Sequence, residues 1–197
     1  MTAKRAVLML ASGLTLLLTA GCAQTISGSG TSATTPASGQ LSPAPSTARA
    51  TAGSGLIPYK GDRFTVSMPG RPVKSSQRVS SAAGPVKLTQ LLVEKDGTAF
   101  NVAYGDYPAG AQLDLNGAAR GSAHGVKGQL ADAKQVTYRG APALDFRIVN
   151  ALGGTVTGFG RDLVVIDRVY QLFVIIFGAN VKTPPAEYLL MRDSLTF

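Results

Sequence analysis

The sequence predicts an α+β sandwich in which a central antiparallel sheet of six or seven strands is flanked by helices. Segments with apolar residues at every second position follow one another through residues 56–197, which is typical of strands with one buried face. Short polar turns join most of these segments, so neighbouring strands are expected to pair as antiparallel hairpins. Helical spacing occurs only near the middle and at the end of this region, which favours helices packed on the faces of the sheet.

The first part of the domain is predicted to contain one strand and one hairpin. Residues 63–68 alternate apolar and polar side chains and are expected to form the first strand. Residues 71–85 are polar and rich in turn-forming residues, so they are expected to form a connection. Residues 86–95 and 98–104 are predicted to pair as a hairpin, because the intervening Asp96-Gly97 is typical of a tight two-residue turn.

Residues 113–130 are predicted to form the first helix. Apolar and small side chains recur there at helical spacing. Gly117, Gly121 and Gly125 each lower helix propensity by about 1 kcal/mol relative to alanine, so the helix depends on its packing. The same glycines would lie on one face and allow a close approach to the sheet.

Four further strands are predicted in the second half of the domain. They cover residues 134–138, 141–149, 155–166 and 169–177, and irregular pairing is expected at the glycines of the third. The last of the four is apolar on both faces, which is typical of a strand that is covered above and below. We therefore expect it at the centre of the sheet.

The domain is predicted to end in a second helix that runs to about Ser194. Thr183 is the expected capping residue and Pro184 the expected first helical residue. Tyr188 and Met191 would then face the sheet.

Residues 1–21 are predicted to be an export leader. Lys4 and Arg5 form a basic start, and residues 6–18 form an uncharged, mostly apolar run. A helix needs about 20 apolar residues to cross the hydrocarbon core of a bilayer, so this run favours a leader over a membrane-spanning helix.

The five residues that end the leader, Leu18-Thr19-Ala20-Gly21-Cys22, resemble the lipobox of bacterial lipoproteins, with Thr19 as the least usual member. The resemblance implies that Cys22 receives a lipid and anchors the protein to the cell membrane on its extracytoplasmic side. Cleavage by an ordinary signal peptidase and an unmodified cysteine are the alternatives. Cys22 is the only cysteine and cannot form an internal disulfide, which favours lipidation.

Residues 22–55 are predicted to be a disordered tether. After Cys22 they consist almost entirely of Ser, Thr, Ala, Gly and Pro, with Arg49 as the only charge. Such a composition has too little apolar surface to offset the entropy of ordering it. A flexible chain of this length reaches roughly 30 Å, which would hold residues 56–197 clear of the membrane.

The composition excludes several classes of function. The net charge is +8, but the basic residues are scattered singly along the chain, so nucleic-acid binding is not expected. The single histidine, His124, has no clustered cysteine or carboxylate beside it, and no metal, cofactor or catalytic role is expected. Four carboxylates could in principle pair across strands as glycosidases require, namely Asp106, Asp145, Asp162 and Asp167. Asp162 and Asp167 each adjoin an arginine, however, and are interpreted as turn residues or surface ion pairs.

Four aromatic residues are candidates for lining a ligand pocket: Tyr104, Tyr107, Phe159 and Tyr170. Packing in the hydrophobic core is the alternative explanation for them.

Three stretches of the domain resemble the Mog1/PsbP-like domains that small actinobacterial cell-envelope lipoproteins carry. They are Phe64-Thr-Val-Ser-Met-Pro-Gly-Arg-Pro near the start, the strand end Asp106-Tyr-Pro, and Arg168-Val-Tyr-Gln-Leu-Phe-Val with the final helix. The resemblance implies a fold used for binding and assembly, without shared catalytic residues.

Together these features predict a lipid-anchored, exported, non-catalytic binding domain of the cell envelope. Its expected ligand is an apolar envelope molecule or a protein partner. The alternative is a structural or interaction protein that docks on anionic cell-wall polymer or on the membrane surface.

Overall fold

The computed structural model of the chain describes residues 55–81 and 83–197. The predicted leader, Cys22 and the predicted tether up to residue 54 lie outside the described residues. Of the helices within the described ranges, none is long and apolar enough to cross a membrane.

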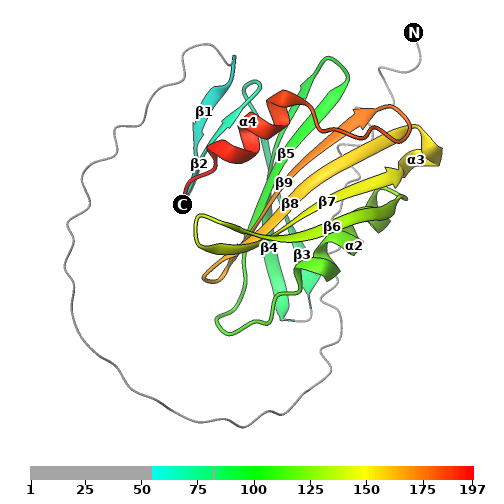
Figure 1. The fold of residues 1–197 in the computed structure, drawn as a ribbon. Coiled ribbons are helices and arrows are strands. Elements are labelled where there is room, and N and C mark those ends of the chain that lie inside the picture. The colour runs from blue at the N-terminus through cyan, green and yellow to red at the C-terminus, as the bar shows by residue number, and fades with distance from the viewer. Residues whose placement is uncertain (1–54, 82) are drawn as a thin grey trace.

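A seven-stranded antiparallel sheet forms the centre of the domain (Figure 1). The strand that the sequence predicts to be central is the fourth of the seven and is bordered by a long strand on each side. The α+β fold with a central antiparallel sheet is therefore confirmed. In order across the sheet, the strands are β3 (Val73–Ser81), β4 (Gly84–Lys95), β5 (Thr98–Asp106), β9 (Arg168–Phe177), β8 (Val156–Val165), β7 (Ala141–Asn150) and β6 (Gln129–Tyr138).

One face of the sheet is covered by helix α4 (Ala186–Ser194) and by a small hairpin of β1 (Ile57–Lys60) and β2 (Thr65–Met68). Figure 1 shows α4 lying across this face. The other face is covered by helix α2 (Leu115–Gly125), and the short α3 (Ala151–Gly154) connects β7 to β8.

The alternating side chains of the strands divide the hydrophobic core into two clusters. On β9, Tyr170 and Leu172 pack with α4 and β2, whereas Val169 and Phe173 pack on the side of α2. The buried residues of α2 are all small, namely Gly117, Ala118, Ala119, Gly121, Ser122 and Ala123. A Cβ on Gly117 would meet Asp114 and not the sheet, and Gly125 is not among the buried residues, so these two glycines do not have the predicted role in a close approach.

Two strands were missed in the sequence. Strand β3 lies in residues 71–85, which were interpreted as a connection, and β1 was not predicted. The reason is that β3 is an edge strand that buries only Val79, so it has no apolar alternation. The predicted helix also ends early, at Gly125, and β6 begins at Gln129.

The turn between β4 and β5 agrees with the prediction from the sequence, whereas the start of α4 does not. Asp96 (φ 50°) and Gly97 (φ 77°) both adopt left-handed backbone conformations, as the predicted tight hairpin turn requires. Helix α4 begins at Ala186 with Pro185 in the capping position, so the predicted capping by Thr183 is wrong.

Strand β8 pairs regularly with both of its neighbours at its glycines, contrary to the predicted irregularity. A Cβ on Gly160 would lie 2.1 Å from the ring of Phe146, and a Cβ on Gly158 would lie 2.7 Å from Phe173. These two rings stack with centroids 5.9 Å apart. The glycines therefore make room for an aromatic pair that packs directly on the strand.

The guanidinium of Arg168 fastens the β1–β2 hairpin to the sheet. Arg168 is 2% exposed, and its Nε and Nη2 donate to the two oxygens of Asp106, both at 2.6 Å. It also donates to the carbonyl and, at 3.0 Å, to the carboxylate of Asp62 in the β1–β2 turn, and it lies 5.2 Å from the ring centroid of Tyr104. The hydrogen bond from Arg168 holds the pKa of Asp106 below its ordinary value.

The C-terminus is joined to the same hairpin. Thr65 and Thr196 exchange two backbone hydrogen bonds of 2.9 Å, and the ring of Phe197 stacks on Tyr170 at 6.1 Å. The last residues thus extend the β1–β2 sheet and cover the ring of Tyr170.

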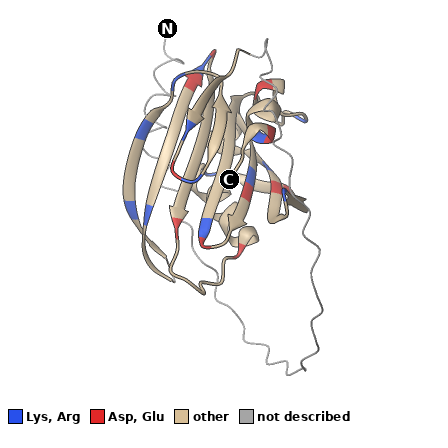
Figure 2. Cartoon of the chain, turned by 90° about the vertical axis from the view of Figure 1, so that its left-hand side faces the viewer, with Lys and Arg blue, Asp and Glu red and all other residues tan. Residues whose placement is uncertain are grey.

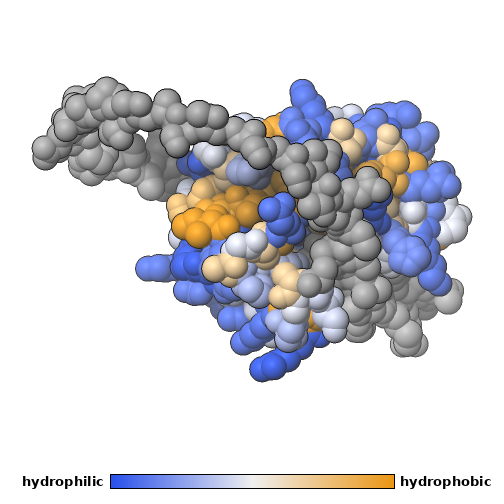
Figure 3. Space-filling model, turned by 90° about the horizontal axis from the view of Figure 1, so that it is seen from below, coloured by the Kyte–Doolittle hydropathy of each residue, from blue (hydrophilic) through white to orange (hydrophobic). Residues whose placement is uncertain are grey.

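The surface is mostly hydrophilic, with apolar patches on the face seen from below (Figure 3). The large apolar residues that are exposed include Ile166 in the β8–β9 turn, at 92%, and Val73 on β3, at 72%.

We predict that Asp106→Ala destabilises the domain by about 3 kcal/mol, because it leaves a buried guanidinium without its main carboxylate partner. Asp167→Ala is the matched control: Asp167 only forms an exposed 3.3 Å pair with Arg63, so its loss should cost less than about 1 kcal/mol. Urea denaturation measures both values.

The stabilisation by Asp106 also depends on pH. Because the folded pKa of Asp106 is lowered, its contribution to the free energy of unfolding is complete at neutral pH and is lost as the pH falls below about 4. Equal losses in the two variants would contradict this role of Asp106.

Candidate functional site

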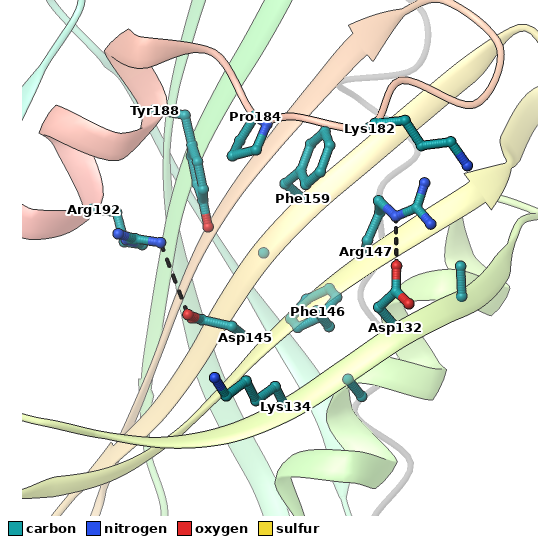
Figure 4. A pocket seen from close by; sticks show the side chains of 13 residues that line it. Asp132, Lys134, Asp145, Phe146, Arg147, Phe159, Lys182, Pro184, Tyr188 and Arg192 are labelled. Atoms are coloured by element: carbon teal, nitrogen blue, oxygen red, sulfur yellow. Dashed lines mark hydrogen bonds and ion pairs between the residues drawn. The ribbon is translucent and has the colours of Figure 1, made fainter.

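A pocket of about 600 Å³ opens between α4, the loop that precedes it and strands β6, β7 and β8 (Figure 4). This volume is in the range of pockets that hold small ligands. Phe159 of β8, Pro184 of the loop and Tyr188 of α4 line it together with six charged side chains. The charged residues are Asp132, Lys134, Asp145, Arg147, Lys182 and Arg192.

The strand register brings the charged side chains to one face of the sheet. Asp145 of β7 lies opposite Lys134 of β6 and Arg161 of β8, and Arg147 lies opposite Asp132 and Phe159. Because side chains alternate along a strand, Leu144 and Phe146, which precede and follow Asp145, point into the core on the other face, as predicted.

An ion-pair cluster stands at one end of the pocket. Arg161 is 7% exposed and donates from Nε and Nη2 to the two oxygens of Asp145, at 2.5 and 2.7 Å. Its guanidinium lies 4.8 Å from the ring centroid of Tyr138, whose hydroxyl donates to carbonyls at the end of α4, including Leu195 at 2.9 Å. Arg192 approaches Asp145 to 3.8 Å. This cluster fixes the C-terminal end of α4 against the sheet.

At the other end of the pocket, Arg147 fixes the loop between β9 and α4. Its Nε donates to Asp132 at 2.7 Å, while its Nη1 donates to Asn180 at 3.2 Å and to the carbonyl of Val181 at 3.3 Å. The backbone of Val181 also donates to the hydroxyl of Thr157 at 3.0 Å. The next residue, Lys182, is therefore carried by an anchored loop.

The arrangement is suited to binding charged groups. Both carboxylates of the pocket are hydrogen-bonded to an arginine, whereas Lys134 and Lys182 form no ion pair with any residue of the described ranges. His124, the only histidine, is exposed on α2, on the opposite side of the sheet. Within residues 55–81 and 83–197, no group of three or more His, Cys, Asp and Glu side chains could hold a metal ion.

The structure separates the four predicted aromatic residues. Tyr104 and Tyr170 are register partners with ring centroids 6.4 Å apart, and they are buried beneath the β1–β2 hairpin. Tyr107 belongs to the core cluster on the side of α2 and Phe159 to the cluster on the side of α4, so all four are buried core residues. Only Phe159 lines the pocket.

Of the charged residues of the pocket, all but Asp145 were missed in the sequence. Asp145 and Arg147 alternate with apolar residues on β7, which usually indicates a solvated face. Neither residue is exposed, however, because α4 and its preceding loop partly cover this face. One signal in the sequence could have revealed these residues. Charged residues stand at every second position on β6 and β7, two strands that are adjacent in the chain.

The prediction that Asp162 forms an ion pair on the surface is wrong. Asp162 is 0% exposed and accepts a hydrogen bond of 2.7 Å from Gln171, which also donates to Ser122 of α2 at 2.9 Å. Neither Oδ2 of Asp162 nor Oε1 of Gln171 has a partner in the described part of the chain. Burial raises the pKa of Asp162 to about 7, although the hydrogen bond from Gln171 lowers it.

No protein-family model matches the chain, and no curated protein sequence matches it. Its fold is similar to the solution structure of cyanobacterial PsbP (CyanoP) from Synechocystis sp. PCC 6803. The TM-score is 0.52 at 9% sequence identity, and the match covers 76% of this chain and 96% of that one. The likeness confirms the predicted PsbP-like fold.

We predict that Asp162→Asn stabilises the domain at pH 8 and changes its stability little at pH 4. The folded pKa is raised, so the unmodified domain loses stability as the pH rises from about 4 to about 7, and the amide removes this loss. The amide nitrogen also puts a hydrogen-bond donor in place of Oδ2, an acceptor that has no partner among the described residues. Urea denaturation across this pH range tests the prediction. A variant that is less stable than the unmodified domain at pH 8 would contradict it.

Proposed function

We propose that the chain is a lipid-anchored, exported and non-catalytic binding domain of the cell envelope. It is attached through Cys22 and binds its ligand in the pocket between α4 and β6–β8. The observation that carries the proposal is the pocket itself, whose charged lining is held in position by Arg147 and Arg161. The leader and the lipobox resemblance support the anchor, and the PsbP-like fold is consistent with an interaction domain.

The pocket supports binding rather than catalysis. General acid–base or nucleophilic catalysis needs a reactive group placed within reach of a substrate and activated by a neighbour. Asp132 and Asp145 are instead each held by an arginine through hydrogen bonds. Such pairs fix the shape and the charge of a binding site.

The lining favours a ligand that is partly polar. The sequence favours an apolar envelope molecule or a protein partner, but six charged side chains border the pocket. Its apolar side chains include Ala131, Ala133, Phe159 and Pro184. A wholly apolar ligand would remove water from these charges without replacing its hydrogen bonds. An amphipathic envelope molecule fits the pocket better.

A second candidate function, docking on an anionic surface, is favoured by the free edge of the sheet. Lys74 and Arg78 of β3 and Lys87 of β4 are exposed, and the strand register sets Arg78 directly opposite Lys87. Figure 2 shows basic residues, in blue, on the strands at the left of the view. None of the three forms an ion pair within the described ranges. Residues that are scattered in the sequence thus form a cationic edge.

We predict that Cys22→Ser moves the protein from the membrane fraction to the soluble fraction of its host. Two or more acyl chains make membrane residence stable, and the serine cannot form the thioether. Mass spectrometry of the mature unmodified protein should find a diacylglycerol group on Cys22 and should identify any ligand that remains bound. An unchanged partition of the variant would rule out the anchor.

We predict that Arg78→Gln with Lys87→Gln weakens binding to vesicles of phosphatidylcholine and phosphatidylglycerol by about thirtyfold, since each basic residue contributes about 1 kcal/mol near an anionic leaflet. Sedimentation with vesicles measures this on the chain from Ala23 to Phe197, which contains all described residues but not Cys22. Lys60→Gln with Lys127→Gln, at two exposed lysines away from both the cationic edge and the pocket, is the control of equal charge.

Unfolding should not complicate this comparison, because removing two like charges that lie opposite each other relieves repulsion within the sheet. If both double variants lose binding equally, only the net charge matters and the cationic edge has no special role.

A further inference from the structure

The lining of the pocket has an excess of positive charge. Four of its side chains are cationic and two are carboxylates, so two positive charges remain unbalanced. The cationic residues are Lys134, Arg147, Lys182 and Arg192, and the carboxylates are Asp132 and Asp145.

The ion pairs of the pocket decide which cations stay free. Lys134 lies directly opposite Asp145 across the β6–β7 pair, but both oxygens of that carboxylate accept hydrogen bonds from Arg161. Asp132 is likewise bound by Arg147. The two lysines therefore have no acidic partner among residues 55–81 and 83–197, and their ammonium groups are available to an anion from outside.

The backbone that carries the two lysines is fixed without a ligand. Lys134 stands on β6, which pairs with β7 along its length. Lys182 follows Val181, whose backbone is bound by both Arg147 and Thr157. A site whose backbone is ordered in advance loses less entropy on binding, which favours affinity.

The same pocket has an apolar side. Phe159 and Pro184 lie next to each other along one wall, with Lys134 across the pocket from them and Lys182 beside Arg147 at the other end (Figure 4). A volume of about 600 Å³ accommodates a compact group or the first part of a longer chain.

The geometry points to a compact anionic amphiphile as the ligand of this pocket. Its carboxylate or phosphate is bound by one of the two lysines that stand at opposite ends of the pocket, Lys134 or Lys182, and its apolar part lies against Phe159 and Pro184. This inference rests on the pocket being the binding site proposed above. A soluble acid or phosphate ester and the acidic headgroup of a membrane lipid share the required chemistry.

Three probes separate the contributions to binding: decyl phosphate, decyl glucoside with the same tail but no charge, and inorganic phosphate. Nuclear magnetic resonance of the chain from Ala23 to Phe197 reports affinity and the residues that respond. Decyl phosphate, kept monomeric, should shift the signals of Phe159 and Tyr188 and bind at least tenfold more tightly than either other probe.

Matched variants assign the charge to the lysines. Lys134→Gln with Lys182→Gln should weaken decyl phosphate binding by about tenfold or more and leave decyl glucoside binding unchanged. Arg78→Gln with Lys87→Gln removes the same charge from the cationic edge and should change neither.

Each contrary result identifies what fails. Equal binding of decyl glucoside and decyl phosphate would overturn the anionic ligand while leaving a binding pocket in place. Equal binding of inorganic and decyl phosphate would overturn the role of Phe159 and Pro184. If no probe shifts the pocket signals, the pocket is not the binding site, and the proposed function loses its main support.

A last comparison distinguishes the two sources of the ligand. If phosphatidylglycerol in a nanodisc shifts the same pocket signals as decyl phosphate, the ligand is a membrane lipid. If only decyl phosphate shifts them, the ligand is a soluble molecule. Both results agree with an anionic amphiphile.

Discussion

One half of the domain depends on the ion pairs and hydrogen bonds of the buried Arg168 guanidinium. A charge that is removed from water is tolerated only when it is paired and its donors are satisfied, and Asp106, Asp62 and the face of Tyr104 meet this requirement together. Asp106 and Tyr104 belong to the last part of β5, and Asp62 belongs to the β1–β2 turn. One side chain therefore sets the position of the hairpin on which α4 packs, and α4 in turn forms a wall of the pocket.

Arg161 has the same role in the other half of the same face. It too is buried, holds a carboxylate with two hydrogen bonds and lies over a tyrosine ring. Its neighbour Asp162 points to the opposite face, where Gln171 and Ser122 are its polar surroundings and its charged form is disfavoured. Adjacent ionisable residues thus have different chemistry because a strand turns successive side chains to opposite faces.

The fold was largely predictable from the sequence, and the site was not. The central position of β9 followed from its two apolar faces, and the β4–β5 turn followed from Asp96-Gly97, because both features depend on local chemistry. Strand β3 was missed because an uncovered edge strand needs no apolar face. The pocket was missed because it depends on which strands become neighbours and on where the loop after β9 lies. Spacing within a single segment does not contain that information.

The two edge strands of the sheet also affect whether copies of the protein pair with one another. Strands β3 and β6 both leave one row of backbone groups unpaired by the sheet, and such rows readily bind the edge of a second molecule. Here the facing basic residues of β3 and β4 repel an identical edge, and the irregular register between Leu130 and Asp132 bends the other. Both features oppose the growth of the sheet across molecules.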